Sequence, residues 1–441
     1  MPAPRYTPAP PVQIQHPEWA RAATLYQINT RQFTPEGTLN AARAHLPRLR
    51  DFGADILWLM PIHPIGEQNR KGTLGSPYAV RDYRAVNPEF GTMDDLRAFV
   101  AEAHRLGMRV ILDWVANHTA WDHPWATEHP EWYARDWAGR FRPTPWWDWS
   151  DVIDLDYARP EVREAMTEAL LFWVREADVD GFRCDVAGMV PTDFWEEARR
   201  QMDAVKPVFL LAEWEARDLH RAAFDATYAW SWYEAVHAIC QGRADVNALY
   251  HYYSWNEKAY PHDVFRMLFT SNHDKNAWDG TMYEQFGDGL EAAVVLSVVS
   301  EGIPLVYNGQ EMGNRRRLAF FERDPIDWPA DGALDRIGEL YRQLFALKRE
   351  TSALHNAGWG ARMVRVVTDD LAHVLGFVRE DEGSKVVALF NFSAEPREVA
   401  LLDGPFAERY RQPLAPDAEP VALAEGARMA LEPWGWRVLV R

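Results

Sequence analysis

Runs of apolar residues alternate, between residues 20 and 350, with segments in which apolar positions recur at intervals of three and four. The runs are short and nearly continuous, as in strands of a parallel sheet that is covered on both faces. The periodic segments between them predict amphipathic helices. Eight runs are of the strand type, at residues 23–33, 54–62, 109–113, 181–186, 208–213, 226–233, 265–272 and 303–308. Eight strand–helix units in one domain predict a (β/α)8 barrel, the TIM barrel, with insertions.

The helix signals between these strands differ in clarity. The clearest begins at Thr92, a capping residue, with Asp95 three positions later and one apolar stripe that ends at a glycine. Another stripe follows Pro160, a residue that is favoured at the first helical position. Residues 39–52 also have helical periodicity, although Pro47 is expected to kink that helix.

Two segments depart from the strand–helix alternation. Residues 119–150 follow the third strand, lack any sustained periodicity and are rich in Trp, Pro, His and Asp. A long loop of this kind in a compact domain is usually functional, so we expect a small subdomain over the barrel mouth. After residue 358 short alternating runs predict an antiparallel β-sandwich, with strands at 361–368, 373–379, 385–392, 397–402, 421–423 and 436–440. The predicted domains are the barrel (1–118 and 151–357), the loop subdomain (119–150) and the C-terminal domain (358–441).

The amino-acid composition limits the classes of partner that the protein is expected to bind. Lys and Arg number 47 against 65 Asp and Glu, a net charge of −18, which argues against nucleic acid or an anionic membrane as the main partner. The 21 Trp and 16 Tyr residues favour a flat ligand such as a sugar, because aromatic rings stack on flat faces as well as fill cores. With two cysteines no disulfide framework is expected. Residues 1–20 are predicted to be an extended lead-in. They show no signal-peptide pattern, which predicts a cytoplasmic protein without a membrane span.

Charged residues follow several of the predicted strands. Arg183 and Asp185 are two positions apart and therefore share one face of the fourth strand. Alone, this pair is better explained as a buried salt bridge than as a site. Three more strands end in polar groups, however, and the carboxyl ends of barrel strands meet at the face that holds active sites. These groups are Asp113 with Asn117 and His118, then Glu213, and then Asn272, His273 and Asp274.

Three carboxyl groups at one mouth suit the chemistry of a glycosidic bond. One carboxylate attacks the anomeric carbon, while a protonated partner releases the leaving oxygen and later activates water. Arg183 beside Asp185 is expected to lower the pKa of that carboxyl and keep it ionised. Glu213 has apolar neighbours, which suits the partner that carries the proton. A retaining mechanism predicts that these two carboxyls lie about 5–5.5 Å apart.

At these residues the chain resembles glycoside hydrolase family 13, the α-amylase family. The four strand-end segments occur in the order found in that family, and together they are highly specific. The matching segments are 113–118 (DWVANH), 181–185 (GFRCD), 210–215 (LLAEWE), 269–274 (FTSNHD), 76–78 (SPY) with 80–92, and 302–311 (GIPLVYNGQE). The barrel, the loop subdomain and the C-terminal β-domain also match the layout of the family.

The resemblance implies a role for each matched residue. Asp185 would be the nucleophile, Glu213 the acid/base and Asp274 the stabiliser of the transition state. The reaction would be retaining hydrolysis of α-1,4-linked glucans or maltooligosaccharides, and no cofactor is required. Other positions would serve these three: Arg183 would orient Asp185, His118 and His273 would bind the sugar, Tyr78 would stack on it, and Asp113 and Asn117 would support the site.

Two positions depart from the pattern of many α-amylases. The Lys-His pair that often follows the nucleophile is replaced by Gly188 and Met189. The lysine position contacts sugar on the leaving side, so the preferred chain length and the product pattern stay open. Asn117 matches a calcium position, whereas Met189 replaces a residue that supplies another calcium contact, so calcium is possible and not established.

Rival functions differ in how well they fit. A metal-dependent barrel hydrolase would have His-x-His on its first strand, where residues 25–29 read LYQIN. A binding protein without activity would be expected to lack a carboxylate, and none is lost. A transglycosylase or isomerase of the same family, or an α-glucosidase acting on short oligosaccharides, would keep every residue named above and stays open as an alternative.

Overall fold

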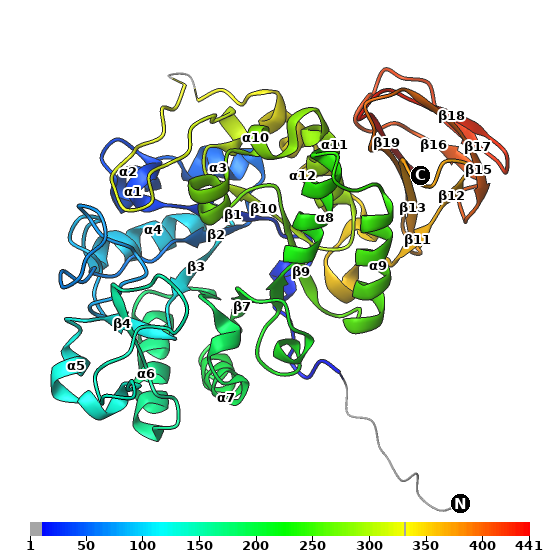
Figure 1. Ribbon diagram of the computed structural model, residues 1–441. Helices are drawn as coiled ribbons and strands as arrows, with labels where there is room; N and C mark the ends of the chain where they lie inside the picture. The colour runs from blue at the N-terminus through cyan, green and yellow to red at the C-terminus, as the bar shows by residue number, and fades with distance from the viewer. Residues whose placement is uncertain (1–10, 330–331) are drawn as a thin grey trace, which may run out of the picture.

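The computed structural model describes residues 11–329 and 332–441, and its largest part is a closed barrel of eight parallel strands (Figure 1). The strands follow the spatial order β1-β10-β9-β8-β7-β6-β3-β2. The predicted TIM barrel is therefore confirmed. Its strands are β1 (Leu25–Ile28), β2 (Ile56–Leu59), β3 (Arg109–Trp114), β6 (Gly181–Cys184), β7 (Phe209–Ala212), β8 (Ala226–Tyr228), β9 (Phe265–Phe269) and β10 (Ile303–Tyr307).

Two predicted strands end earlier than expected. The first stops at Ile28, and residues 30–33 form a short helix instead. The sixth stops at Tyr228, because a helix begins at Trp230. After Tyr228 the residues stay mostly apolar, and apolar content alone does not separate a buried strand from the buried helix that follows it. After Ile28 the residues up to Gln32 are polar, so the apolar run itself ends with the strand.

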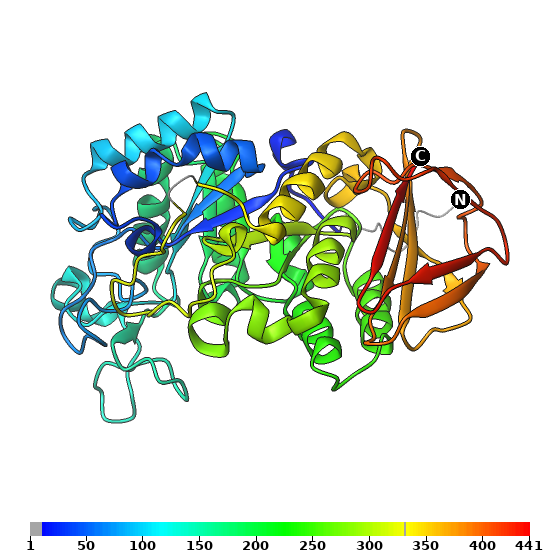
Figure 2. The same ribbon diagram turned by 90° about the horizontal axis from the view of Figure 1, so that it is seen from above.

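Helices surround the barrel, as the view from above shows (Figure 2). The helix predicted at 39–52 is broken in two, and Pro47 lies in the first turn of the second part, where a missing N–H costs nothing. The helices are α1 (Thr30–Phe33), α2 (Leu39–Arg43), α3 (Leu46–Phe52), α4 (Met93–Arg105), α6 (Pro160–Glu176), α7 (Thr192–Asp203), α8 (Trp230–Cys240), α9 (Asn247–Ala259), α10 (Met282–Phe286), α11 (Leu290–Val299) and α12 (Arg336–Glu350). Shorter helical turns are η1 (Glu18–Ala20), η3 (Ala187–Met189), η4 (Arg217–His220), the π-helical η5 (Lys275–Asp279), η6 (Gly287–Gly289), η7 (Gln310–Met312), η8 (Ser352–Leu354) and η9 (Ala357–Trp359).

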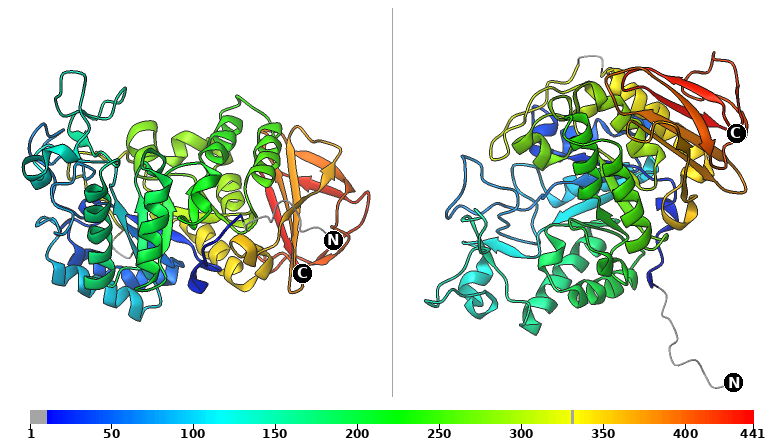
Figure 3. Two further views of the ribbon diagram at one scale, coloured as in Figure 1. Left: turned by 90° about the horizontal axis from the view of Figure 1, so that it is seen from below. Right: turned by 45° about the vertical axis from the view of Figure 1, so that its right-hand side comes forward.

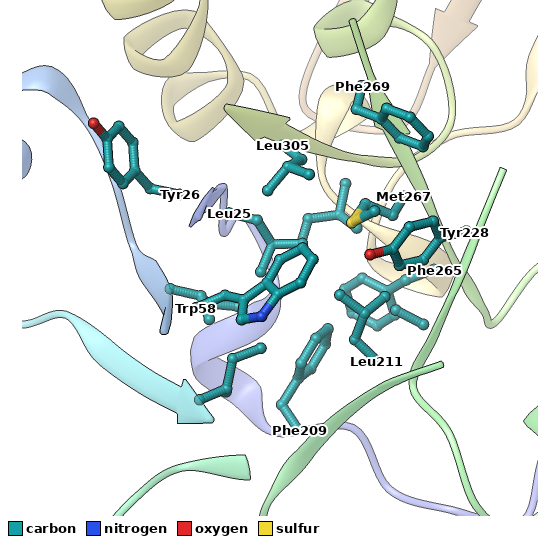
Figure 4. Packing of buried hydrophobic residues seen from close by; sticks show 14 of the residues in the cluster. Leu25, Tyr26, Trp58, Phe209, Leu211, Tyr228, Phe265, Met267, Phe269 and Leu305 are labelled. Atoms are coloured by element: carbon teal, nitrogen blue, oxygen red, sulfur yellow. The ribbon is translucent and has the colours of Figure 1, made fainter. Parts of the chain in front are cut away.

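Apolar side chains from many strands fill the barrel. In Figure 4, Leu25, Trp58 and Leu211 gather in the interior, while Tyr26, the neighbour of Leu25, points away from them. This is the alternation expected of a strand, whose successive side chains face opposite sides. Trp58 is fully buried, and its indole N–H donates to the Asp113 carboxylate at 2.9 Å. The core packing therefore reaches directly to the polar groups at the barrel mouth.

A small excursion connects β3 to α6. Its base is a two-stranded antiparallel sheet of β4 (His118–Ala120) and β5 (Val152–Asp154). Between them lie α5 (Pro124–Glu128) and η2 (Pro130–Trp132), in the cyan region of Figure 1. This excursion contains the segment predicted as the loop subdomain, which is more regular than its sequence suggests. The domain limits at 118, 151 and 357 stay a prediction.

The C-terminal domain lies at one end of the molecule, beside α9 and α11 (Figures 1 and 3). It consists of antiparallel sheets around a separate apolar cluster, so the predicted sandwich is confirmed. The prediction missed β16 and β18, which are three and four residues long. The strands are β11 (Met363–Arg365), β12 (Val367–Thr368), β13 (Val374–Glu380), β14 (Lys385–Asn391), β15 (Arg397–Asp403), β16 (Glu408–Tyr410), β17 (Val421–Leu423), β18 (Arg428–Leu431) and β19 (Trp436–Val440).

The predicted lead-in, residues 1–20, is only partly covered. Residues 1–10 lie outside the described residues, and the turn η1 occupies its last three positions. Among residues 11–329 and 332–441, no helix combines the length and apolar character needed to cross a bilayer.

Candidate active site

The carboxyl ends of the barrel strands bring the predicted side chains together. Asp185 and Glu213 directly follow β6 and β7, and Asp274 lies five residues beyond β9. A cavity of about 420 Å³ opens at this face. Six of the predicted site residues line it: Tyr78, His118, Asp185, Glu213, His273 and Asp274. Arg183 and Asp113 are fully buried in contact with this set, and Asn117 contacts His118.

Arg183 lies at the centre of three carboxyl groups. Its Nη1 donates to Asp113 at 2.8 Å and to Asp185 at 2.9 Å, and its Nη2 lies 3.1 Å from Glu213. The guanidinium also lies over the ring of Trp58, with its carbon 5.0 Å from the ring centroid. Because one planar group touches both Asp185 and Glu213, the two carboxyls that would react are held at neighbouring positions.

The pKa of Asp185 differs from the prediction that Arg183 would lower it. Burial and the negative charge of Glu213 raise this pKa well above its usual range, and Arg183 opposes them without prevailing. The prediction considered the nearby cation and left out desolvation, which favours the neutral acid. Protonation of the two carboxyls is consequently interdependent. When Glu213 carries a proton the repulsion disappears, and Arg183 then stabilises the Asp185 carboxylate.

A residue with a strained backbone, Val186, makes a further contact with Glu213. Val186 has φ 36° and ψ 46°, a left-handed conformation that β-branched residues rarely adopt. In this conformation its N–H donates to Oε2 of Glu213 at 2.8 Å. A residue held in such a conformation costs on the order of 1–3 kcal/mol, and such residues cluster at active sites. Nothing in the local sequence distinguishes Val186 from an ordinary strand residue.

A chain of hydrogen bonds fixes the orientation of His273. Gln27 on β1 accepts the backbone N–H of His273 at 3.3 Å, and its amide nitrogen donates to Nδ1 of the ring at 2.7 Å. The other ring nitrogen, Nε2, therefore carries the hydrogen and donates to the Tyr78 hydroxyl at 2.8 Å. Tyr78 in turn donates to Asp113 at 3.0 Å. Gln27 was not among the predicted site residues, because its role depends on a contact with a residue 246 positions away.

Titration of these groups follows from their burial. Burial, with the charge of Arg183, lowers the pKa of His273 to about 3, so the ring is neutral. Burial lowers the pKa of His118 to about 4. The same desolvation raises the pKa of Asp113 to about 6 and that of Asp274 to about 6. The cavity thus combines neutral imidazoles with carboxyls that titrate close to neutrality.

The residues around Asn117 do not fit a calcium ion. The Asn117 amide nitrogen lies 3.3 Å from Asp154, and the Thr144 hydroxyl donates to the same carboxylate oxygen. The guanidinium of Arg142 lies 3.9 Å from the other oxygen. Protein donors therefore surround the carboxylate that a hard cation would need. Across residues 11–329 and 332–441, no cluster of three or more His, Cys, Asp or Glu side chains is arranged to hold a metal.

A second hollow, which we call the leaving-side groove, meets the cavity at the reacting carboxyls. Its volume is about 600 Å³, and both hollows are lined by Glu213 and Asp274. Four indole rings and one thioether complete the groove: Trp147, Trp149, Trp214, Trp230 and Met189. The indole of Trp214 lies directly against Gly188, where an added Cβ would be 2.2 Å from Cε2 of the ring. An aromatic face thus occupies the region of the lysine that many α-amylases carry.

Comparison with known proteins tests the resemblance. Residues 20–324 match the family model described as alpha amylase, catalytic domain. MalA, an alpha-amylase of Haloarcula japonica, is 29% identical over 405 residues, which are 88% of this chain and 58% of MalA. The crystal structure of a noncanonic maltogenic alpha-amylase, AmyB from Thermotoga neapolitana, is similar with a TM-score of 0.86 and 31% identity. That match covers 95% of this chain and 98% of AmyB.

A transferase is also among the relatives. An alpha-1,4-glucan:maltose-1-phosphate maltosyltransferase of Rhodospirillum rubrum is 37% identical over 211 residues, which are 42% of this chain and 30% of that protein. The chain thus spans 58% of MalA and 30% of the transferase. The family model, in contrast, covers most of the chain, including every predicted site residue. With its closed barrel and its strand-end carboxyls, the chain belongs to the α-amylase family, glycoside hydrolase family 13.

Proposed function

We propose that this protein is a retaining glycosidase that cleaves α-1,4-glucosidic bonds in maltooligosaccharides or starch-like glucans. Asp185 is the nucleophile, Glu213 the acid/base and Asp274 the group that stabilises the positive charge of the transition state. Tyr78, His118 and His273 bind the sugar at the bond that is cleaved. Arg183 and Asp113 position Asp185, while Asn117 positions His118.

The reaction takes two steps. The Asp185 carboxylate attacks the anomeric carbon, and Glu213 donates its proton to the glycosidic oxygen, so that bond breaks and a glycosyl ester of Asp185 forms. Glu213, now a carboxylate, takes a proton from water, and the resulting hydroxide attacks the anomeric carbon and releases Asp185. Two inversions restore the α configuration in the product.

One observation carries the proposal: a single buried guanidinium contacts both reacting carboxyls at the cavity surface. The contact favours a charged Asp185 when Glu213 holds the proton. The backbone N–H of Val186, a residue with a strained conformation, donates a hydrogen bond to the Glu213 carboxyl and fixes its position. The neutral His273 donates a hydrogen bond to the hydroxyl of Tyr78 and adds no positive charge to the cavity.

The test is product analysis with maltoheptaose. The protein is incubated with this substrate, the products are separated by size, and proton NMR follows the first anomer released. Shorter maltooligosaccharides with an initial α anomer are expected. An initial β anomer would exclude the double displacement, and an unchanged substrate would exclude the proposed activity.

Glycosyl transfer is the second candidate, because the leaving-side groove has a volume of about 600 Å³ and is lined by four tryptophans. An acceptor sugar bound there would compete with water for the glycosyl ester. The relationship to a maltosyltransferase agrees with this alternative. Products longer than maltoheptaose at high substrate concentration would identify transfer, and trehalose-type products would identify isomerisation.

A further inference from the structure

The cavity at the reacting carboxyls is bordered by a loop segment that the proposed reaction does not use. This segment, residues 71–75, lies between β2 and α4, and we call it the strap. Lys71 of the strap lines the cavity, together with Asp148 and Asp151 of the β3–α6 excursion and Phe320 and Phe321 from the loop after β10.

At one end the strap is bound to the excursion through charge. The Lys71 ammonium donates to the backbone carbonyl of Asp148, and it lies 3.7 Å from each of the carboxylates of Asp148 and Asp151. The side chain of Asp151 is only 7% exposed, so this end of the contact is shielded from water. A partly buried ion pair is screened less than a surface pair.

At the other end the strap is bound to the loop after β10. The backbone N–H and the hydroxyl of Thr73 both donate to the Glu322 carboxylate, the first at 2.8 Å. The N–H of Leu74 donates to the carbonyl of Phe321 at 3.3 Å. Gly72 has φ 65°, and a Cβ there would lie 2.5 Å from Cβ of Phe321, so the two loops touch at the backbone.

A third contact supports the strap from beneath. The guanidinium of Arg31, which is 4% exposed, donates to the carbonyl of Gly75 at 3.0 Å. The strap is thus attached to the excursion, to the loop after β10 and to the barrel. Three separate attachments make a continuous wall rather than a mobile loop.

The residues that line the two hollows indicate on which side of the reacting bond the wall lies. They meet at Glu213 and Asp274, and the leaving-side groove extends from there past Met189 and Trp214. Neither the strap nor Phe320 or Phe321 lines that groove. Asp185, Tyr78 and His273, which contact the attacked sugar in the proposed function, line the cavity and not the groove. The wall therefore borders the side that holds the non-leaving part of the glucan.

On the basis of the proposed glycosidase function, we propose that the strap closes the non-leaving side of the cavity, so that the enzyme acts from the non-reducing end of its substrate and releases a short sugar. A glucan chain that continued past the wall would have to displace Lys71 from two carboxylates. The cavity of about 420 Å³ lies at the small end of the range for ligand pockets. A cavity of this size favours a short non-leaving segment of the substrate.

The experiment compares two substrates that differ only at the non-reducing end. Both are maltoheptaosides with a chromogenic group at the reducing end, and one carries a cyclic acetal on the 4- and 6-hydroxyls of the terminal glucose. The wild-type enzyme is expected to cleave the free substrate at least about tenfold faster, in kcat/KM, because the wall excludes the blocked end. Mass spectrometry of early products is expected to show one short sugar removed from the free substrate.

The variant Lys71→Ala/Glu322→Ala removes the side-chain attachments at both ends of the strap and leaves the backbone hydrogen bond between Leu74 and Phe321. We expect its preference for the free substrate to fall to within about threefold, with longer sugars among the early products. Arg81→Ala is the matched control, since it removes ion pairs of the same loop with Glu67 and Asp122 outside the cavity. This control should keep the wild-type preference.

Each outcome has one meaning. If the wild-type enzyme cleaves both substrates equally, the strap proposal is wrong while the glycosidase proposal stands. If the double variant, with a wild-type melting temperature, keeps the full preference, the strap is not the wall. If neither substrate is cleaved, the reaction on which the strap proposal depends is absent and both proposals fail.

Discussion

Gly188 and Trp214 are packed so closely that one methyl group added at position 188 should displace the indole from the leaving-side groove. An alanine Cβ at 188 would lie 2.2 Å from Cε2 of the indole and 2.3 Å from Cδ2 and Nε1. Carbon atoms in favourable contact are about 3.5–4.0 Å apart, so the ring must move by more than 1 Å. Gly188 does not have a left-handed backbone, so the perturbation is steric alone.

The size of the expected loss in kcat/KM depends on how freely the Trp214 indole can move. Overpacking a buried site costs about 1–3 kcal/mol, but Trp214 is 36% exposed and can rotate toward solvent. The ring then no longer presents its face to the leaving sugar. If the displaced stacking contact is worth about 1.4 kcal/mol, kcat/KM falls about tenfold for substrates whose leaving group is a sugar.

The assay uses two leaving groups. Gly188→Ala is expected to lower kcat/KM on maltooligosaccharides about tenfold and to change hydrolysis of a nitrophenyl maltoside by less than about threefold, because the second leaving group does not extend along the groove. Trp214→Ala should give the same pattern. The double variant should resemble Trp214→Ala, since two changes that act through one contact are not additive. Two results would refute this reasoning: additive losses in the double variant, or wild-type kinetics for Gly188→Ala. Either would show that Trp214 does not form a stacking surface for the leaving sugar that depends on the absence of a side chain at Gly188.

Three further outcomes test the site. Asp185→Asn should lower kcat at least about 10⁴-fold with an unchanged circular dichroism spectrum, and turnover near the wild-type rate would exclude Asp185 as the nucleophile. Burial raises the pKa of Asp274 to about 6. Its contribution to stability is thus present below about pH 4 and lost as the pH rises through 6. Asp274→Asn should therefore gain more in Tm over the wild type at pH 7 than at pH 4, whereas parallel Tm curves would contradict this. An excess of EDTA should leave Tm within about 1 °C, and a rise of several degrees with added calcium would show that the protein binds calcium.

The barrel and the location of the site could be predicted because both depend on local patterns. Near-continuous apolar runs mark buried parallel strands, and a charged residue at the end of such a run stands out. Asp113, Asp185 and Glu213 follow this rule, and the structure places them around one guanidinium. The boundaries were less predictable: the residues after Ile28 and Tyr228 belong to helices, and those after Tyr228 stay mostly apolar, so the pattern does not mark the end of that strand.

Contacts between distant loops could not be predicted. Gln27 orients His273 from a strand 246 positions earlier, and its own sequence context is an ordinary apolar strand. Lys71 looks like a solvated loop residue until the fold brings it to Asp148 and Asp151. Gly188 gives no sign that an indole covers it. Each of these features depends on tertiary packing, for which hydrophobic periodicity has no signal.

The raised pKa of Asp185 follows from the balance of charge around Arg183. One cation, Arg183, faces the three carboxyls of Asp113, Asp185 and Glu213 inside a desolvated mouth. If all three were ionised the cluster would carry a charge of −2, which burial strongly disfavours. Burial accordingly raises the pKa values of Asp113 and Asp185.

The arrangement therefore favours keeping a proton in the cluster near neutral pH before any substrate binds. A glycosidic bond needs such a proton at the moment the leaving oxygen departs. The N–H of Val186 donates to the Glu213 carboxyl at 2.8 Å, and Nη2 of Arg183 lies 3.1 Å from it. The same excess of negative charge costs stability in the resting protein, which is the usual conflict between stability and activity at a catalytic centre.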